Sequence, residues 1–302
     1  MHVALFFHGR VPVQGYGGTE RVVHWLARGL AELGHEVTLI AGRGSRIPEA
    51  RVIEVDSGSA EDYHFDVARH LPRGAEVLHA HRPCPPGPIP TLWTQHGNPR
   101  PHPRQLPPNM VCLSADHATR NGAGAFVYNG LDPNDYQFAA TKGPFDLFLG
   151  RLRTLKGWQW AVEGARRSGH PLVVAGGWRP VFRRGVRFVG TVDGDEKRRL
   201  LAEAACLWMP ARWEEPFGLT LIEALASGTP VLGTRRGALP EIVTAEVGVL
   251  GDTLDDLVAG RAAVDRVRPE ACRARVAERF SHRTMAEGYL ALYRRVAAGE
   301  TL

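Results

Sequence analysis

Residues 3–42, VALFFHGRVPVQGYGGTERVVHWLARGLAELGHEVTLIAG, alternate between strand-like and helix-like stretches. Residues 3–7 and 37–42 are short, mostly apolar runs of the length that buried parallel strands have. Between them, the valines and leucines of residues 20–34 recur at helical spacing, and Gly34 provides a C-terminal stop. Strand, helix and strand in this order predict a β-α-β unit, and therefore a parallel sheet with helices on its faces.

This alternation continues along the chain and starts again after residue 140. In the first half we expect further strands at 77–81, 91–97 and 110–114, whereas ten prolines between residues 82 and 108 exclude regular structure from most of that segment. In the second half we expect strands at 146–151, 171–177, 186–190, 206–210 and 230–234, a shorter one at 244–251, and helices at 157–168, 195–205 and 218–227. The pattern predicts an α/β fold of two doubly wound, Rossmann-like domains that face each other across a cleft.

The expected domains are residues 1–140 and 141–284, because 302 residues suit two domains of about 150 residues. An amphipathic stretch at 285–299, within the final segment 285–302, is expected to form a helix that packs back on the first domain. Ligands of doubly wound sheets bind beyond the carboxyl ends of the strands, so chemistry is expected in the loops that follow strands.

Composition places the chain among globular proteins, with 44% hydrophobic and 23% charged residues. No apolar run approaches the length of a membrane span, and the N-terminus has the pattern of a strand rather than a secretory leader. Four cysteines without a C-x-x-C pair suggest neither a zinc site nor a disulfide framework. We therefore expect a cytoplasmic protein, with peripheral contact at the inner face of an anionic membrane as an extension.

Positive charge is concentrated in the second half of the chain. Residues 1–140 hold 12 basic and 13 acidic residues, a net charge of −1. Residues 141–302 hold 25 basic and 19 acidic residues, a net charge of +6, and the two give the +5 of the whole chain. Only three of the basic residues are lysines. Such a field suits a nucleotide or an anionic membrane, and equally a solvated arginine-rich surface. The one basic and aromatic stretch, residues 182–188, has no recognisable module around it, so no nucleic-acid partner is expected.

Residues 212–231, RWEEPFGLTLIEALASGTPV, carry two carboxylates in an apolar setting. Gly218 stands near the start of an expected helix, where unpaired N–H groups favour an anion. Glu223 lies inside the apolar run and needs a partner, and a vicinal diol such as ribose would satisfy it. Glu215, just before the helix, could bind a second polyol in the same way. The alternative is a dipole-stabilised Glu215 and a core-edge Glu223 paired to an arginine.

This stretch resembles the signature of the family 4 retaining glycosyltransferases of the GT-B fold, in which two glutamates are separated by seven residues. EPFGLTLIE matches that pattern over its full length. The resemblance implies a nucleoside-diphosphate-sugar donor whose sugar hydroxyls contact Glu215 and whose ribose contacts Glu223. It also implies that sugar and phosphate meet the amides around Phe217, Gly218, Leu219 and Thr220.

Two further stretches of the second half fit the same family. GRLRTLKG, residues 150–157, reproduces the family pattern G-R-x-x-x-x-K-G, with Arg151 and Lys156 near a helix start. Two fixed cations there can neutralise the charge of a departing diphosphate, although surface cations are the plain alternative. Val192 resembles the family position that borders the base.

Loops of the first half supply the remaining candidates. In GYGGTE, residues 15–20, Gly17 and Gly18 let the backbone approach a donor, and Thr19 is a candidate helix cap. His96 ends an expected strand and resembles the family histidine that reaches the reacting sugar. Glycine loops and lone histidines are commonly structural, so these candidates depend on their place after strands.

Metal binding is the main rival chemistry. His79 and His81 form H-x-H near Cys84 and His96, but alternate residues of a strand point to opposite faces, so the pair shares a metal only if the strand has ended. Asp193 and Asp195 match a D-x-D pattern that a strand-to-helix turn favours anyway. We therefore expect no metal.

The sequence predicts a metal-independent, retaining glycosyltransferase without a cofactor. His96, Glu215, Arg151 and Lys156 are the expected catalytic residues. The expected donor is a UDP-sugar with a hexose-type sugar, with GDP- and ADP-sugars as alternatives, and the acceptor is a hydroxyl of a sugar, a lipid-linked sugar or a small metabolite. A sugar-nucleotide epimerase, or a non-catalytic protein that binds nucleotide-sugars or anionic surfaces, remains open because a fold does not fix its chemistry.

Overall fold

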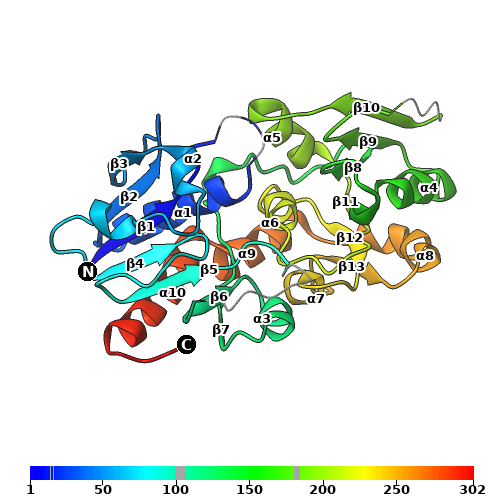
Figure 1. Cartoon of the computed structure of the whole chain (residues 1–302). Helices are drawn as coiled ribbons and strands as arrows, with labels where there is room; N and C mark the ends of the chain where they lie inside the picture. Colours follow the sequence, from blue (N-terminus) through cyan, green and yellow to red (C-terminus); the bar gives the residue numbers. More distant parts are fainter. Residues whose placement is uncertain (14, 16, 99–106, 180–183) are drawn as a thin grey trace. The chain divides into compact units, whose positions relative to one another are not determined.

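The structure is a computed structural model that describes residues 1–302 except 14, 16, 99–106 and 180–183 (Figure 1). The chain divides into two compact units, Met1–Gly130 with Ser281–Leu302, and Leu131–Phe280. The boundaries expected from the sequence were after residues 140 and 284. In the structure, residues 131–140 belong to the second unit and residues 281–284 belong to the first. The reason is local, since Leu131 N–H donates to the carbonyl of Phe280 within the second unit.

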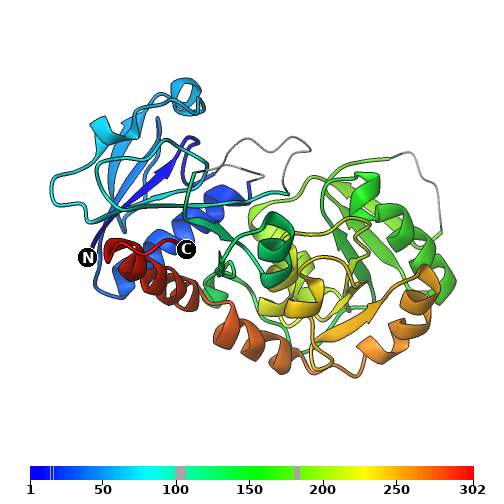
Figure 2. The same cartoon turned by 60° about the horizontal axis from the view of Figure 1, so that its bottom comes forward.

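The first unit, called the N-terminal unit, is built on one sheet with the strand order β3-β2-β1-β4-β5-β6-β7, in which every neighbouring pair is parallel. Its strands are β1 His2–Phe7, β2 Glu36–Gly42, β3 Arg51–Val55, β4 Val77–Ala80, β5 Thr91–Thr94, β6 Met110–Cys112 and β7 Ala125–Phe126. Its helices are α1 Thr19–Glu32, α2 Ser57–Ala60, α3 Ala115–Asn121 and α10 His282–Ala297, with a short 3-10 helix at Val67–His70. The final helix α10 packs beside α1 (Figure 2).

The second unit, called the C-terminal unit, has the strand order β10-β9-β8-β11-β12-β13, again parallel throughout. Its strands are β8 Asp146–Leu149, β9 Leu172–Ala175, β10 Val186–Gly190, β11 Leu207–Met209, β12 Val231–Thr234 and β13 Gly248–Gly251. Its helices are α4 Trp158–Ser168, α5 Gly194–Glu203, α6 Leu219–Ala226, α7 Leu239–Ile242, α8 Leu254–Val264 and α9 Pro269–Arg279, with 3-10 turns at Pro133–Asp135 and Thr154–Lys156.

Both sheets confirm the expected doubly wound, Rossmann-like fold. In each sheet the chain first adds strands on one side of its first strand and then returns to add strands on the other side. This reversal creates a switch point between β1 and β4 in the N-terminal unit, and between β8 and β11 in the C-terminal unit. Loops that follow these four strands therefore occupy the positions at which doubly wound sheets bind ligands.

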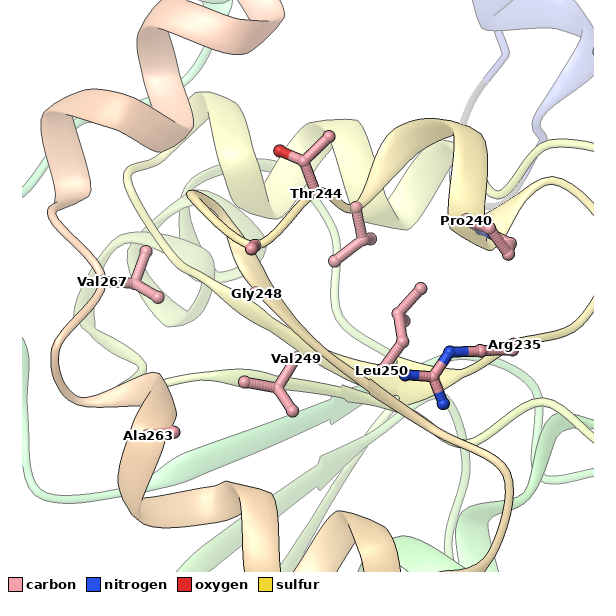
Figure 3. Close-up of a pocket in the computed structure, with 10 residues that line it drawn as sticks. Arg235, Pro240, Thr244, Gly248, Val249, Leu250, Ala263 and Val267 are labelled. Carbon is pink, nitrogen blue, oxygen red and sulfur yellow. The ribbon is translucent and has the colours of Figure 1, made fainter.

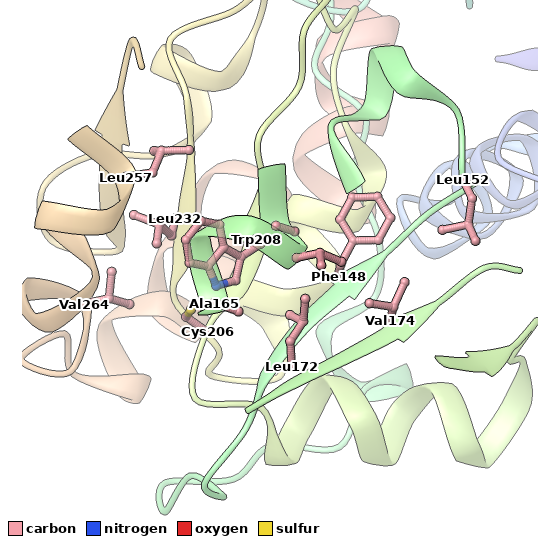
Figure 4. Close-up of a cluster of buried hydrophobic side chains, with 12 residues drawn as sticks. Phe148, Leu152, Ala165, Leu172, Val174, Cys206, Trp208, Leu232, Leu257 and Val264 are labelled. Atoms are coloured by element: carbon pink, nitrogen blue, oxygen red, sulfur yellow. The ribbon is translucent and has the colours of Figure 1, made fainter. Parts of the chain in front are cut away.

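The core of the C-terminal unit surrounds Trp208, whose side chain is fully buried among Phe148, Ala165 and Leu232 (Figure 4). Its indole Nε1–H donates to Asp146 Oδ2 at 2.8 Å. Arg261, which is 1% exposed, also donates to both oxygens of Asp146, at 2.6 and 2.8 Å. Every polar group of this buried set has a partner, as burial of charge requires.

The expected strands are present, but the sequence pattern missed several elements. Edge strand β3 and the two-residue β7 were not predicted, nor were α2, α3, α7, α8 and α9. The expected helix of residues 285–299 is α10. Among the helices of the described residues, none combines the length and apolar character that crossing a membrane requires.

Candidate functional site

The loops after β8 and β11 meet at the switch point of the C-terminal unit. Lys156, from the first loop, places its Nζ 2.6 Å from Oε2 of Glu215, from the second. The same oxygen accepts the indole N–H of Trp213 at 3.0 Å, and the Lys156 ammonium lies 4.6 Å from the centre of the Trp213 ring. Two residues expected to act together thus form one partly buried ion pair, supported by an aromatic side chain.

Backbone contacts hold these two loops against each other. Arg212 N–H donates to the carbonyl of Leu155 at 2.8 Å. Gly157 has a φ of 77°, and a Cβ at this position would lie 1.8 Å from the carbonyl oxygen of Pro210. Because only glycine permits this approach, the last residue of GRLRTLKG fixes the distance between the two loops.

Glu223 lies on α6 and is 2% exposed. Its Oε1 accepts a bond from Lys197 Nζ at 2.6 Å and another from the Tyr136 hydroxyl at 2.9 Å. Within the part of the chain that the structure describes, its charged partner is therefore a lysine from α5, in place of the arginine of the alternative.

The start of α6 has the features of an anion-binding helix terminus. Gly218 is its N-cap with a φ of 92°, and no side chain caps the helix. A Cβ at Gly218 would lie 2.9 Å from Leu221 Cδ1, so a side chain would crowd the first turn. The first-turn amides of Leu219 and Thr220 have no helical carbonyl to bond. Phe217, by contrast, is 1% exposed and packs on Phe280, so only its backbone can contact a ligand.

Arg151 and Val192 lie in two different strand-to-helix connections of the same unit, after β8 and after β10. Arg151 is exposed and begins the loop after β8 that ends with Lys156. Val192 is buried and lies between β10 and the start of α5, the helix that also carries Lys197. The structure therefore places both residues at the carboxyl edge of the sheet, where the sequence predicted them.

The glycine loop of the N-terminal unit follows β1, although Tyr16 lies outside the described residues. Gly18 is the N-cap of α1, and no side chain caps this helix. The prediction that Thr19 acts as the cap is wrong, because Thr19 is already the first helical residue. A Cβ on Gly17 would lie 2.6 Å from Glu20 Oε2 and 2.7 Å from Val13 Cγ2, so a side chain here would require these neighbours to move.

His96 follows β5 and contacts a second histidine. His81, directly after β4, has its Nδ1 3.0 Å from His96 Nε2. His79 is fully buried, with Nδ1 2.7 Å from the Tyr293 hydroxyl and Nε2 2.7 Å from that of Thr94. Burial lowers the pKa of His96 to about 3 and holds the pKa values of His79 and His81 well below their usual range. All three rings are therefore neutral at pH 7.

The histidine cluster does not have the arrangement of a metal site. Strand β4 ends at Ala80, so His81 turns to the same side as His79, and their rings stack with centres 4.4 Å apart. Both nitrogens of His79 already face hydroxyl groups. Asp195 of the D-x-D pattern forms an ion pair with Arg198 at 2.5 Å. No group of three or more His, Cys, Asp or Glu residues able to hold a metal ion occurs in the described part of the chain.

Four residues of these sites were missed by the sequence reading, namely Trp213, Tyr136, Lys197 and His81 as a partner of His96. For Lys197 the sequence did contain a signal, because lysine is rare in this chain. All three lysines of the chain make buried or partly buried contacts, since Lys142 donates to two backbone carbonyls and to Thr229. In a chain that otherwise uses arginine, each lysine marks a place where a compact ammonium is needed.

A pocket of about 490 Å³ lies elsewhere in the C-terminal unit, at edge strand β13 (Figure 3). Gly248, Val249 and Leu250 of that strand line it together with Thr244 and Arg235. None of the expected site residues contributes to it. The pocket is therefore separate from the loops at the switch point.

Comparison with known proteins agrees with this arrangement. A family model of "Glycosyl transferases group 1" matches residues 144–265, and one of "Glycosyltransferase Family 4" matches residues 16–130. The crystal structure of AviGT4, a glycosyltransferase involved in avilamycin A biosynthesis, is 31% identical with a TM-score of 0.85, and the match covers 99% of both chains.

Two curated relatives match this chain with lower coverage or lower identity than the AviGT4 structure does. The glycogen synthase of Mycobacterium tuberculosis is 32% identical over 205 residues, which cover 58% of this chain and 49% of that protein. The phosphatidyl-myo-inositol mannosyltransferase of Propionibacterium freudenreichii is 27% identical over 298 residues, which cover 78% of each. The matched part thus spans about half the length of the curated glycogen synthase.

Two parallel sheets of Rossmann-like order, matched over the whole chain by a solved glycosyltransferase, define the class as a two-domain α/β protein of the GT-B type. The chain belongs to the GT-B glycosyltransferase family, and it is a glycosyltransferase.

Proposed function

We propose that this glycosyltransferase transfers a hexose-type sugar from a nucleoside diphosphate to an acceptor hydroxyl, with retention at the anomeric carbon and without a metal. UDP is the nucleotide we place first, with GDP and ADP as the alternatives. The observation that carries the proposal is the contact of Lys156 with Glu215 at the switch point of the C-terminal unit. It unites the two motifs that the family resemblance assigns to the donor.

Fixed positive charge supports the placement of the diphosphate in this unit. Lys156 and Arg151 share one loop, and the uncapped start of α6 at Gly218 adds amide donors. When the bond to the sugar breaks, negative charge grows on the departing diphosphate. Cations and amides that are already in place stabilise this charge without reorganisation, so no metal is required.

The nucleoside is assigned to the region around α5 and α6. We propose that Glu223 accepts hydrogen bonds from the ribose diol and that Val192 borders the base. Lys197 and Tyr136 already bond to Glu223 Oε1, so they fix the carboxylate and neutralise it before the ribose arrives. A preorganised carboxylate loses less conformational freedom on binding than a mobile one.

The sugar is assigned to Glu215, with Gly17, Gly18 and His96 as further predicted contacts. Glu215 already has Lys156 and Trp213 as partners, so its orientation is set before a sugar binds. The ammonium of Lys156 would then face the diphosphate on one side and Glu215 on the other. This arrangement couples recognition of the sugar to recognition of the leaving group.

The acceptor is proposed only as a class, a hydroxyl of a sugar, a lipid-linked sugar or a small metabolite. Two of the relatives are named as a glycogen synthase and a phosphatidyl-myo-inositol mannosyltransferase, which supports the first two of these classes. We propose a cytoplasmic location, with peripheral contact to an anionic membrane if the acceptor carries a lipid.

A time course by proton NMR tests the proposed reaction. The full chain is incubated with UDP-glucose, GDP-mannose or ADP-glucose and with a panel of simple glycosides, in the presence of EDTA. We expect a new α-glycoside from one α-linked donor, formed much more slowly with Lys156→Ala. A β-linked product would contradict retention, and a donor that is epimerised without transfer would contradict the transferase assignment.

A further inference from the structure

We propose that His81 is a positioning residue that fixes the tautomer of His96, so that His96 carries its proton on Nδ1 and acts as a hydrogen-bond donor. The inference concerns two residues of the N-terminal unit and a contact between their rings. It rests on the proposed function only where it names the acceptor of that proton as an oxygen of the bound donor.

The position of His81 is fixed by the strands beside it. Its backbone N–H donates to the carbonyl of Phe6 at 2.9 Å, which ties the residue to β1. His81 is 4% exposed, and its ring stacks with two other imidazoles, with ring centres 4.4 Å from His79 and 5.2 Å from His96. Its Nδ1 faces His96 Nε2 at 3.0 Å, so one of the two neutral rings must donate to the other.

The remaining nitrogen of His81 decides which ring donates. Its Nε2 is buried and has no hydrogen-bond partner among the described residues. A proton on Nε2 would be a buried hydrogen-bond donor without an acceptor. A lone pair on Nε2 would be a buried acceptor without a donor, which costs less free energy. The proton of His81 therefore sits on Nδ1 and is donated to His96 Nε2. His96, being neutral, then carries its own proton on Nδ1.

Nearby groups do not change this assignment. His117 has the opposite tautomer, because its Nδ1 accepts the Leu113 N–H at 3.2 Å and its Nε2–H donates to the carbonyl of Gly97 at 3.0 Å. Both nitrogens of His79 face hydroxyl groups of Thr94 and Tyr293. No hydrogen-bonding partner of His96 Nδ1 is found within the described residues, so this N–H is available for a ligand.

The tautomer decides what His96 can do in the reaction. Its Nε2 lone pair is engaged by His81, and its Nδ1 carries a proton, so neither nitrogen can act as a general base. The Nδ1–H can donate to a hydroxyl of the donor sugar. This role agrees with same-face transfer, in which the departing diphosphate itself can take the acceptor proton. His96 is then a residue that binds and orients the donor.

Long-range ¹H–¹⁵N correlation of the histidine rings in the full, ¹⁵N-histidine-labelled chain reads the tautomers directly. We expect a protonated Nδ1 for His96 and a protonated Nε2 for His117, which serves as an internal reference, with peaks assigned from His96→Gln. His81→Asn offers an amide N–H near the position of ring Nδ1 and should retain the His96 tautomer. His81→Asp offers only an acceptor and should move the proton of His96 to Nε2.

A wild-type spectrum with the His96 proton on Nε2 would overturn the inference, even if the aspartate variant failed to fold. An unchanged tautomer in a folded His81→Asp variant would overturn it as well. For the ligand, titration with the UDP-sugar and with UDP should show about tenfold weaker binding of the UDP-sugar in His81→Asp, with UDP unaffected. Equal loss for both ligands would overturn the assignment of this proton to the sugar. If wild type binds no nucleotide at all, the proposed function fails while the ring spectra still decide the tautomer.

Discussion

Lys156 and Glu215 are 59 residues apart in the sequence, yet the ammonium of one lies 2.6 Å from the carboxylate of the other. The contact forms because parallel strands β8 and β11 are neighbours in the sheet, so the loops after them meet. It brings the two strongest sequence motifs of the chain into one site. The same ammonium can hold Glu215 and attract a diphosphate, which makes Lys156 the natural place to test the account.

Removing the Lys156 charge should reduce transfer more than it reduces stability. We expect Lys156→Ala to lower kcat/KM by about 10²–10³-fold, the usual effect of losing one group that stabilises developing charge. Arg153→Ala is a matched control, because Arg153 is an exposed cation of the same loop. Comparable loss in both variants would show that the overall field, rather than the position of Lys156, supports the reaction.

Lys197→Met should destabilise the fold, because it leaves the Glu223 carboxylate buried without its cation. The two side chains are 12% and 3% exposed. Breaking a buried pair in this way costs about 3 kcal/mol of unfolding free energy, which urea denaturation measures. The double variant Lys197→Met with Glu223→Gln should recover much of that loss, since no uncompensated charge remains. A stable single variant would contradict the pairing.

Gly164→Ala tests the packing of α4 on the core. A Cβ at Gly164 would lie 2.3 Å from the ring of Trp208, which is fully buried and bonded to Asp146. Overpacking of this kind costs about 1–3 kcal/mol. The control is Gly58→Ala in α2, where the nearest atom, Asp56 Oδ1, is 3.5 Å away. Equal urea midpoints for the two variants would count against the close contact.

Acid should destabilise the N-terminal unit through the cluster of His79, His81 and His96. Burial lowers the pKa of His96 to about 3, and the pKa values of His79 and His81 are also held well below their usual range. The unfolded chain takes up these protons near pH 6.5 while the folded chain does not, so the stability that is present above pH 6.5 is lost as the pH falls. Each ring contributes up to about 1.4 kcal/mol per pH unit.

Urea denaturation between pH 8 and pH 5 measures this effect. The slope of unfolding free energy against pH should become less steep in the double variant His81→Asn with His96→Gln. An unfolding free energy that is independent of pH over this interval would contradict the neutral state of the three rings.

The strands that are buried in the sheets were predictable from the sequence. Each of them is marked by a short apolar run, which can be recognised without knowing which strand it pairs with. It missed β3, where Arg51 and Glu54 interrupt the apolar pattern at the edge of the sheet, and β7, which has only two residues. Helix α9 was missed because arginines crowd its sequence and its apolar face is narrow, with Cys272 and Val276 as its buried residues.

The candidate site was predictable as far as its motifs extend. Glu215, Glu223 and Lys156 stand out by spacing and by their place after strands. Their partners did not, because Tyr136 contacts Glu223 across 87 residues and Lys197 contacts it across 26, with no pattern that links them. Long-range side-chain contacts follow from the packing of loops and helices, which sequence periodicity does not describe.

The central claim is that the C-terminal unit binds a nucleoside diphosphate through Lys156, Glu223 and the start of α6, without a metal. A thermal-shift panel of UDP, GDP, ADP and their sugar conjugates, with and without EDTA, tests it most directly. A nucleotide at 100 times its Kd should stabilise the full chain by about 2.7 kcal/mol. We predict that one nucleotide does so regardless of EDTA and that Glu223→Gln removes the effect. If no nucleotide raises the Tm of the folded wild-type chain, the claim is wrong.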